Sequence, residues 1–197
     1  SVYGEGSYEC KNCGIVYPEL RGKEQLENKD WEMHCPRCGE YVRPIPTYEE
    51  RPLFNLSTYA LSKYTQERMA LNYGFTLNIP TIVFRYFNVY GPRQSLNNPY
   101  TGVCAIFSSR IKNNNPPIIF EDGKQTRDFI YVEDIARANL LALEKFEGVE
   151  VFNVGTGNPV SILEIANTLI QLYGKNLEPH ISQEYMDMRL SSDVNKN

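Results

Sequence analysis

The 197-residue chain lacks the features of a membrane protein and of a nucleic-acid-binding protein. No stretch approaches 18 uninterrupted apolar residues, and the amino terminus is neither a basic-then-apolar signal nor an Arg-rich transit peptide. Twenty Lys and Arg against 24 Asp and Glu give a net charge of −4, so the positive field that drives nonspecific nucleic-acid binding is missing. We therefore expect a soluble, cytoplasmic protein with no nucleic-acid partner and no membrane partner.

Internal repeats and low-complexity tracts are also missing from the sequence. Hydrophobic residues make up 42% of the chain and aromatic residues 12%, which is typical of a folded globular protein. The chain begins at Ser1 without Met and ends in a polar run at 191–197. From these ends we expect a fragment of a longer protein.

Cysteine is scarce, but four of the five cysteines form two similar turns, CKNCG at 10–14 and CPRCG at 35–39. Two Cys-x-x-Cys turns can complete a tetrahedron of thiolates around zinc, and the charged residues between them cannot supply a hydrophobic core. A redox pair or a disulfide framework is the alternative, although a redox Cys-x-x-Cys usually occurs once and disulfides are rare in the cytosol. The spacing predicts a structural zinc bound by Cys10, Cys13, Cys35 and Cys38.

Two further residues are expected to have no metal-binding or catalytic role. His34 is adjacent to Cys35, and adjacent residues seldom bind one tetrahedral ion together. Cys104 stands alone in an apolar helical pattern, where a lone cysteine is more often a small buried hydrophobe than a nucleophile.

The remainder of the chain alternates helical and strand patterns after a Pro-bearing connector at 44–52. This alternation predicts an α/β layered sheet. Ser161 with Glu164 three residues later predicts a capping box at the start of the last helix. The predicted helices are at about 56–74, 101–112, 133–146 and 161–173, and the predicted strands are at 80–87, 117–120, 128–131 and 150–154.

Tyr59 and Lys63 are four residues apart on the first of these helices, so they share a face. An ammonium beside a phenol favours the phenolate, which is a general base, but one exposed charge is too weak to do this alone. The simpler interpretation of Lys63 is a solvated side chain paired with Glu67.

Six segments give this pair a context: SVYG at 1–4, YALSK at 59–63, RYFNVYGPR at 85–93, FEDG at 120–123, RDFIYVED at 127–134 and FNVG at 152–155. In this order they resemble the extended short-chain dehydrogenase/reductase family, specifically its NAD-dependent nucleotide-sugar epimerases and dehydratases. The resemblance covers nearly all of 1–4 and 45–185. The cysteine-bearing insertion and NPYTGV at 98–103 are similar to the branch that includes dTDP-L-rhamnose 4-epimerases and UDP-glucose 4-epimerases.

The resemblance implies the fold and its organisation. The fold would be the C-terminal part of a Rossmann-like, doubly wound parallel sheet with a small α+β substrate-binding region and an inserted zinc ribbon with four cysteine ligands. Residues 1–7 would end a Rossmann strand and 8–47 would form the ribbon. Residues 48–99 would continue the Rossmann fold with the Tyr/Lys helix, and 100–197 would mix Rossmann and substrate-binding elements. The full-length protein would be a homodimer.

The resemblance also implies a role for each candidate residue. Tyr59 would be the base that takes the proton of the sugar 4-hydroxyl, and Lys63 would hold the nicotinamide ribose of NAD. Tyr86 would touch the cofactor. The nucleotide-sugar substrate would contact the remaining candidates, with Asn88, Arg127 and Arg189 near its phosphates and Val103, Ile119 and Phe120 around its base.

The chain departs from the family in two places. The Gly-rich turn that meets the pyrophosphate does not occur in the sequence, and the catalytic Ser/Thr of the family would precede Ser1. The 197-residue chain alone is therefore expected to be inactive and not to hold NAD. Toward the end, YMDMRL at 185–190 departs from the Gly-Asp-x-Arg pattern around the second phosphate-binding arginine.

Three functions remain open on the sequence. The first is a nucleotide-sugar 4-epimerase. The second is a 4,6-dehydratase of the same family, which needs a Glu where Ser1 stands. The third is a zinc-ribbon binding module on an inactive α/β scaffold.

Overall fold

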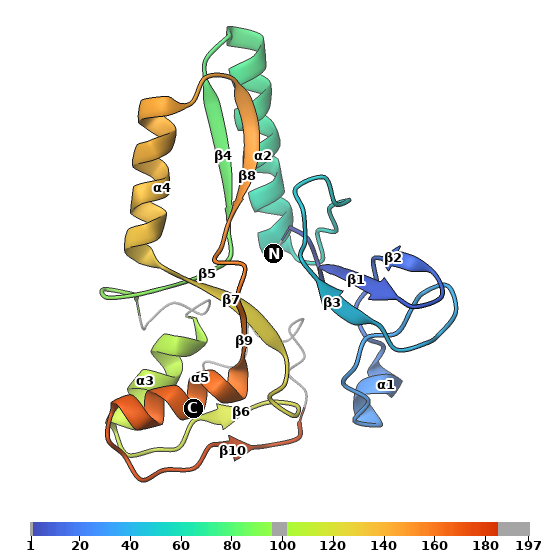
Figure 1. The fold of residues 1–197 in the computed structure, drawn as a ribbon, viewed down its shortest axis with the longest axis vertical. Helices are drawn as coiled ribbons and strands as arrows, with labels where there is room; N and C mark the ends of the chain where they lie inside the picture. The colour runs from blue at the N-terminus through green and yellow to red at the C-terminus, as the bar shows by residue number, and fades with distance from the viewer. Residues whose placement is uncertain (1, 96–101, 185–197) are drawn as a thin grey trace. The chain divides into compact units, whose positions relative to one another are not determined.

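A computed structural model describes residues 2–95 and 102–184 of the chain. The chain divides into two units, one formed by 1–85 with 141–153 and the other by 86–140 with 154–197. Each unit is built from two separate stretches of the chain. Figure 1 labels the helices and strands. No helix in the described residues is long and apolar enough to cross a membrane.

The first unit begins with a small antiparallel sheet. Strand β1 (Ser7–Cys10) pairs on one side with β2 (Gly14–Val16) and on the other with β3 (Arg43–Ile45), and the short helix α1 (Lys23–Glu27) lies in the intervening loop. A cluster of Cys10, Val16, Met33, Cys35 and Val42 forms its core. Residues 2–5 form a turn, and their assignment to the end of a Rossmann strand stays a prediction.

The long helix α2 (Thr58–Leu77) follows the connector. It begins where expected because the Ser57 hydroxyl accepts a hydrogen bond from the Ala60 N–H at 3.1 Å, an N-cap. It ends at Leu77 instead of Gly74, and Asn78 adopts the left-handed conformation (φ 53°) that closes the last turn. The sequence prediction stopped too early because Gly74 looked like a terminator, whereas this glycine lies inside the helix against Thr81.

Two strands run alongside α2 in the first unit (Figure 1). Strand β4 (Thr81–Tyr86) and strand β8 (Val149–Val154) lie where the apolar runs predicted strands, and the structure pairs them with each other. The Thr81 N–H donates to the Gly148 carbonyl at 2.7 Å and so aligns the start of the pair.

The second unit packs short strands with helices. Helix α3 (Val103–Lys112) and helix α5 (Ile162–Leu172) enclose a core of Phe107, Ile111, Ile119, Ala166 and Ile170. The capping box at Ser161 and Glu164 is confirmed. Helix α4 (Val132–Lys145) directly follows β7 (Thr126–Tyr131), and its residues from Leu141 onward belong to the first unit. The strands are β5 (Asn88–Tyr90), β6 (Ile118–Ile119), β7 (Thr126–Tyr131), β9 (Pro159–Ser161) and β10 (His180–Ile181).

The sheets are smaller than the predicted doubly wound sheet. The described strands form β4–β8, β5–β7–β9, β6–β10 and the β2–β1–β3 sheet of the ribbon segment. The β5–β7 and β6–β10 pairs are parallel, whereas β7–β9 is antiparallel. The fold is a mixed α/β, Rossmann-like arrangement with parallel pairs, and the two- and three-residue strands β5, β9 and β10 were too short to leave a pattern in the sequence.

Candidate functional site

The structure brings Tyr59 and Lys63 together in the first turns of α2. The Lys63 Nζ atom lies 5.6 Å from the centroid of the Tyr59 ring, and 40% of Tyr59 is exposed. Lys63 Nζ also donates to Gln66 Oε1 at 3.3 Å. An exposed phenol with an ammonium over its ring can exchange a proton with a small molecule and offers that molecule a second, cationic contact.

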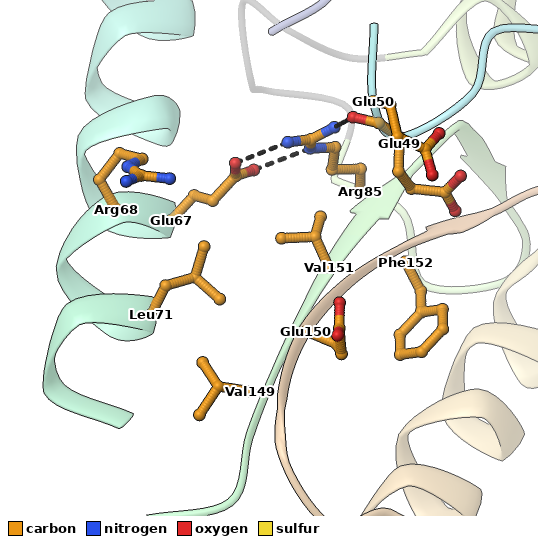
Figure 2. Close-up of a pocket in the computed structure, with 10 residues that line it drawn as sticks. All are labelled: Glu49, Glu50, Glu67, Arg68, Leu71, Arg85, Val149, Glu150, Val151 and Phe152. Atoms are coloured by element: carbon orange, nitrogen blue, oxygen red, sulfur yellow. Dashed lines mark hydrogen bonds and ion pairs between the residues drawn. The ribbon is translucent and has the colours of Figure 1, made fainter. Parts of the chain in front are cut away.

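Glu67 is not the partner of Lys63. Both of its carboxylate oxygens accept hydrogen bonds from Arg85 on β4, at 2.8 Å from Nε and 2.6 Å from Nη2. The two side chains are 5% and 10% exposed, so this is a buried, bidentate ion pair (Figure 2). The Lys63–Glu67 pair considered from the sequence is therefore wrong, because a buried arginine competes for the carboxylate from another element.

Arg85 makes further hydrogen bonds that the sequence patterns did not indicate. Its Nη1 atom donates to the Tyr3 hydroxyl at 2.7 Å and to the Glu49 carbonyl at 2.9 Å. The Tyr3 hydroxyl donates in turn to Asn153 Oδ1 at 2.7 Å. Burial raises the pKa of Tyr3, and the hydrogen bonds to Glu67 raise the pKa of Arg85, so Tyr3 stays a neutral donor and Arg85 stays charged. Arg85 and Tyr3 each lie in a quoted motif, but nothing in the spacing showed that they meet.

Arg51 is a second buried cation that no motif indicated. It is 4% exposed, and it donates to the Gly6 carbonyl at 2.9 Å and to the Pro52 carbonyl at 2.6 Å. Its guanidinium lies 5.0 Å from the Tyr17 ring centroid and 5.3 Å from that of Phe54. Burial lowers the pKa of Arg51. Through Gly6, just before β1, and Tyr17, just after β2, these contacts attach the connector to the end of the β1–β2–β3 sheet.

Tyr86 and Asn88 fall in the second unit. The Tyr86 hydroxyl and the Asn139 side chain on α4 are hydrogen-bonded, with Asn139 Nδ2 donating at 2.9 Å. Asn88 is exposed at the start of β5, where it is paired in register with Phe129 of β7. Their roles toward cofactor and substrate stay predictions.

Arg127 is exposed on β7, and its Nη1 atom donates to the Thr126 carbonyl at 2.8 Å. Arg127 and its neighbour Asp128 both lie within β7, which pairs with β9. A guanidinium on an exposed strand position can bind phosphate oxygens, so Arg127 stays a predicted phosphate ligand.

The three residues predicted around the base have different surroundings. Ile119 is 1% exposed and belongs to the core between α3 and α5. Val103 packs against the same core from the start of α3, and Phe120 is half-buried just after β6. The Ile119 side chain therefore packs in the core, while the part that these residues play toward a base stays a prediction. Arg189 lies outside the described residues.

The four amino-terminal cysteines converge. Their Sγ atoms all lie within 4.8 Å of one another, and those of Cys10 and Cys38 are 3.6 Å apart. Four thiolates around a tetrahedral zinc lie about 3.8 Å from one another, so this donor set fits that ion closely. His34 is not part of the cluster: its Nε2 contacts Asp30 at 2.7 Å and its Nδ1 contacts the Gly39 carbonyl at 2.9 Å.

Cys104 is half-buried in α3, and burial raises the pKa of its thiol. A protonated, partly buried thiol is a poor nucleophile, which agrees with the packing role expected from the sequence.

The comparisons with known proteins agree with this fold and these motifs. The model of the NAD dependent epimerase/dehydratase family matches residues 38–155, and the chain belongs to this family.

Its relatives include dTDP-L-rhamnose 4-epimerase of Burkholderia thailandensis, which is 34% identical over 192 residues that make up 95% of this chain and 50% of that protein. The UDP-glucose 4-epimerase of Thermotoga maritima, solved with UDP-glucose, is 38% identical with a TM-score of 0.66 over 76% of this chain and 48% of that one. The UDP-glucose 4-epimerase of Thermus thermophilus, solved with NAD, is 34% identical with a TM-score of 0.61 over 70% of this chain and 44% of that one. The chain thus spans about half the length of the relatives that it matches.

Proposed function

We propose that this chain is the part of an NAD-dependent nucleotide-sugar 4-epimerase that carries the proton-transfer residues, with dTDP-L-rhamnose or UDP-glucose as the substrate class. The observation that carries the proposal is the exposed Tyr59 phenol with the Lys63 ammonium 5.6 Å from its ring centroid on α2. Membership of the family and the names of the relatives support it.

The residues present fit the nicotinamide end of the cofactor. Tyr59 and Lys63 offer a hydroxyl and an ammonium on one exposed face of α2, which suits a ribose diol. The Gly-rich turn for the pyrophosphate is not in this sequence, so the rest of the cofactor site requires residues that this chain does not supply. When bound, NAD would supply a reversible acceptor for the hydride of the sugar C4 carbon.

The work of the chain is to hold and move one proton. Tyr59 as phenolate takes the proton of the sugar 4-hydroxyl while C4 is oxidised to a ketone, and Lys63 stabilises the phenolate and orients the ribose. Tyr59 then returns the proton to the oxygen at C4 after the opposite face of the ketone has been reduced. The stereochemistry at C4 is inverted with no net oxidation, and Arg127 would hold the diphosphate during the turn of the sugar.

Tyr59→Phe in the full-length protein tests the proposal. We expect turnover of UDP-glucose or dTDP-L-rhamnose to the C4 epimer, followed by NMR of the product, to fall by about 10²–10⁴-fold while substrate binding survives. Tyr73→Phe, a second exposed tyrosine on α2, is the matched control and should keep its activity. The 197-residue polypeptide alone should show no turnover and no binding of NAD⁺ in a calorimetric titration.

The other outcomes separate the alternatives. A Tyr59→Phe protein with most of its turnover would show that Tyr59 is not the base. A 4-keto-6-deoxy product would identify a dehydratase, and no turnover in the wild-type full-length protein would favour the non-catalytic ribbon module.

We also propose that Cys10, Cys13, Cys35 and Cys38 hold one structural zinc, supported by the mutual approach of their Sγ atoms within 4.8 Å. Four cysteine ligands leave no open coordination position, so the metal would stabilise the β1–β2–β3 sheet and take no part in the reaction. The homodimer is proposed for the full-length protein, and sedimentation equilibrium would measure it.

A further inference from the structure

Helix α2 carries a third residue, the carboxylate-bearing Glu67, in line with Tyr59 and Lys63. Tyr59, Lys63 and Glu67 follow one another at intervals of four residues, a spacing that places side chains on one helix face. A lysine and a glutamate at this spacing on an exposed face attract each other. Here Glu67 turns instead to Arg85 (Figure 2), and Lys63 Nζ donates to Gln66 Oε1 at 3.3 Å.

Arg85 is well placed to keep Glu67 from Lys63. The guanidinium binds both carboxylate oxygens through Nε and Nη2, while its Nη1 is held by the Tyr3 hydroxyl and the Glu49 carbonyl. The planar group is therefore fixed from two sides and cannot rotate away without breaking four hydrogen bonds. A single lysine in its place could not hold both oxygens and both other partners at once.

The charges around Glu67 show that Arg85 is its main counter-ion. A cavity of about 470 Å³ lies between α2, the connector and β8, with Glu67 and Arg85 in its wall. Glu49 and Glu50 of the connector and Glu150 of β8 face the same cavity and repel the Glu67 carboxylate, and Arg68 is the further cation in its lining. The hydroxyl of Tyr3 contributes a neutral dipole, and Lys63 remains the cation one turn away on α2.

We infer that Arg85 is a positioning residue that sequesters the Glu67 carboxylate and thereby leaves the Lys63 ammonium available to Tyr59 and to the ribose of the cofactor. This inference rests on the proposed function. The same ion pair fixes α2 to β4 and so holds the face that carries Tyr59 in one register.

Removal of Arg85 would leave the Glu67 carboxylate buried and unpaired, which is costly. Lys63 lies one turn away at the spacing that favours a Lys–Glu pair, so the carboxylate is expected to rotate toward this lysine. A carboxylate on Lys63 offsets the positive charge that stabilises the Tyr59 phenolate. Proton removal from the substrate would then require a higher pH, and turnover at neutral pH would fall.

The test compares Arg85→Gln, Arg85→Gln/Glu67→Gln and the wild type in the full-length protein. For Arg85→Gln we expect kcat for the C4 epimerisation of UDP-glucose to fall about tenfold at neutral pH with KM little changed, and the acid limb of the kcat profile to move up by about one pH unit. The double variant has no carboxylate to offer Lys63, so its acid limb should return toward the wild-type position. Arg43→Gln, which breaks the exposed Arg43–Glu9 pair of the ribbon segment, is the matched control and should not move the limb.

A second readout does not depend on activity. Acylation of Lys63, followed by mass spectrometry of the apoprotein, should be slower in Arg85→Gln than in the wild type, because an ammonium held by a carboxylate reacts more slowly. The rate should recover in the double variant. If the wild type does not epimerise, the proposed function fails, and the acylation rates alone decide the sequestration.

An unmoved acid limb and an unchanged acylation rate in folded Arg85→Gln would overturn the inference. A limb that stays displaced in the double variant would also overturn it, because the effect would then come from a distorted scaffold. If Arg85→Gln does not fold, Arg85→Met, which has no charge to pair with Glu67, replaces it. A displacement that Glu67→Gln abolishes in that background would support the inference, and the absence of a displacement would contradict it.

Discussion

The carboxylate of Asp128, in the middle of β7, accepts hydrogen bonds from Thr156 and from Gly157. The Thr156 N–H donates at 2.9 Å, its hydroxyl at 2.7 Å and the Gly157 N–H at 2.8 Å. One side chain thus satisfies two backbone donors in the loop after β8, where no strand partner is available to them. Asp128 therefore holds the loop that links β8 to β9.

Asp128→Asn should destabilise the protein by about 1–2 kcal/mol, because an amide offers a single acceptor oxygen and no charge to these donors. The free energy of unfolding in urea measures the loss. Asp122→Asn is the control, since Asp122 accepts one backbone hydrogen bond, from Lys124 in an exposed turn, and its loss should cost less. Equal costs for the two variants would show that the convergence on Asp128 contributes nothing.

Gly74→Ala should also destabilise the protein, against the usual trend for a helix interior. At an open helix position, replacing Gly by Ala raises the free energy of unfolding by about 1 kcal/mol. Here a Cβ atom would lie 2.4 Å from the Thr81 Oγ1 atom and 2.7 Å from its Cβ, so α2 would have to move away from the start of β4. We expect a net loss of about 1–3 kcal/mol in urea unfolding. Asn72→Ala, at an exposed position of the same helix, is the control and should be neutral or stabilising. A stabilising Gly74→Ala would contradict the close approach of Gly74 to Thr81.

One zinc per chain should accompany the purified protein, and elemental analysis measures it. Cys10→Ser removes a buried ligand from the cluster and should reduce the stoichiometry toward zero, whereas Cys104→Ser should keep the metal. Chelation should increase hydrogen exchange across 8–43 and leave α5 protected, because the metal holds the segment together and α5 has its own core. A Cys10→Ser protein that retains its metal would contradict the four-cysteine site.

The start of α5 should contribute a pH-dependent stability. The hydroxyl and the N–H of Ser161 donate to Glu164 Oε2 at 2.6 and 2.9 Å, and these hydrogen bonds lower the pKa of Glu164. A group whose pKa is lower when folded stabilises the protein fully above its unfolded pKa, about 4.3 for Glu, and loses that contribution as the pH falls through the folded value. The difference in melting temperature between the wild type and Glu164→Gln should therefore be largest above about pH 5 and shrink on acidification. A difference that grows toward low pH would contradict the assignment.

Local sequence patterns were enough to predict several features of the candidate site. The shared face of Tyr59 and Lys63 follows from a spacing of four on a helix, and the helix itself begins at a capping serine. The capping box of α5 is equally local. The approach of the four cysteines was predicted as well, because two Cys-x-x-Cys turns can complete a tetrahedron of thiolates.

The tertiary structure alone decided which partner each charged residue takes. Glu67 could pair with Lys63 on its own helix, and only the arrival of Arg85 from β4 in a buried, bidentate geometry excludes that pair. The sequence likewise does not show that Ile119 packs in the core or that Asp128 closes a loop 28 residues later. Spacing along one element determines a shared face, whereas burial and pairing depend on elements far apart in the chain, because hydrogen bonds and desolvation act over a few ångströms of space and not over positions in a sequence.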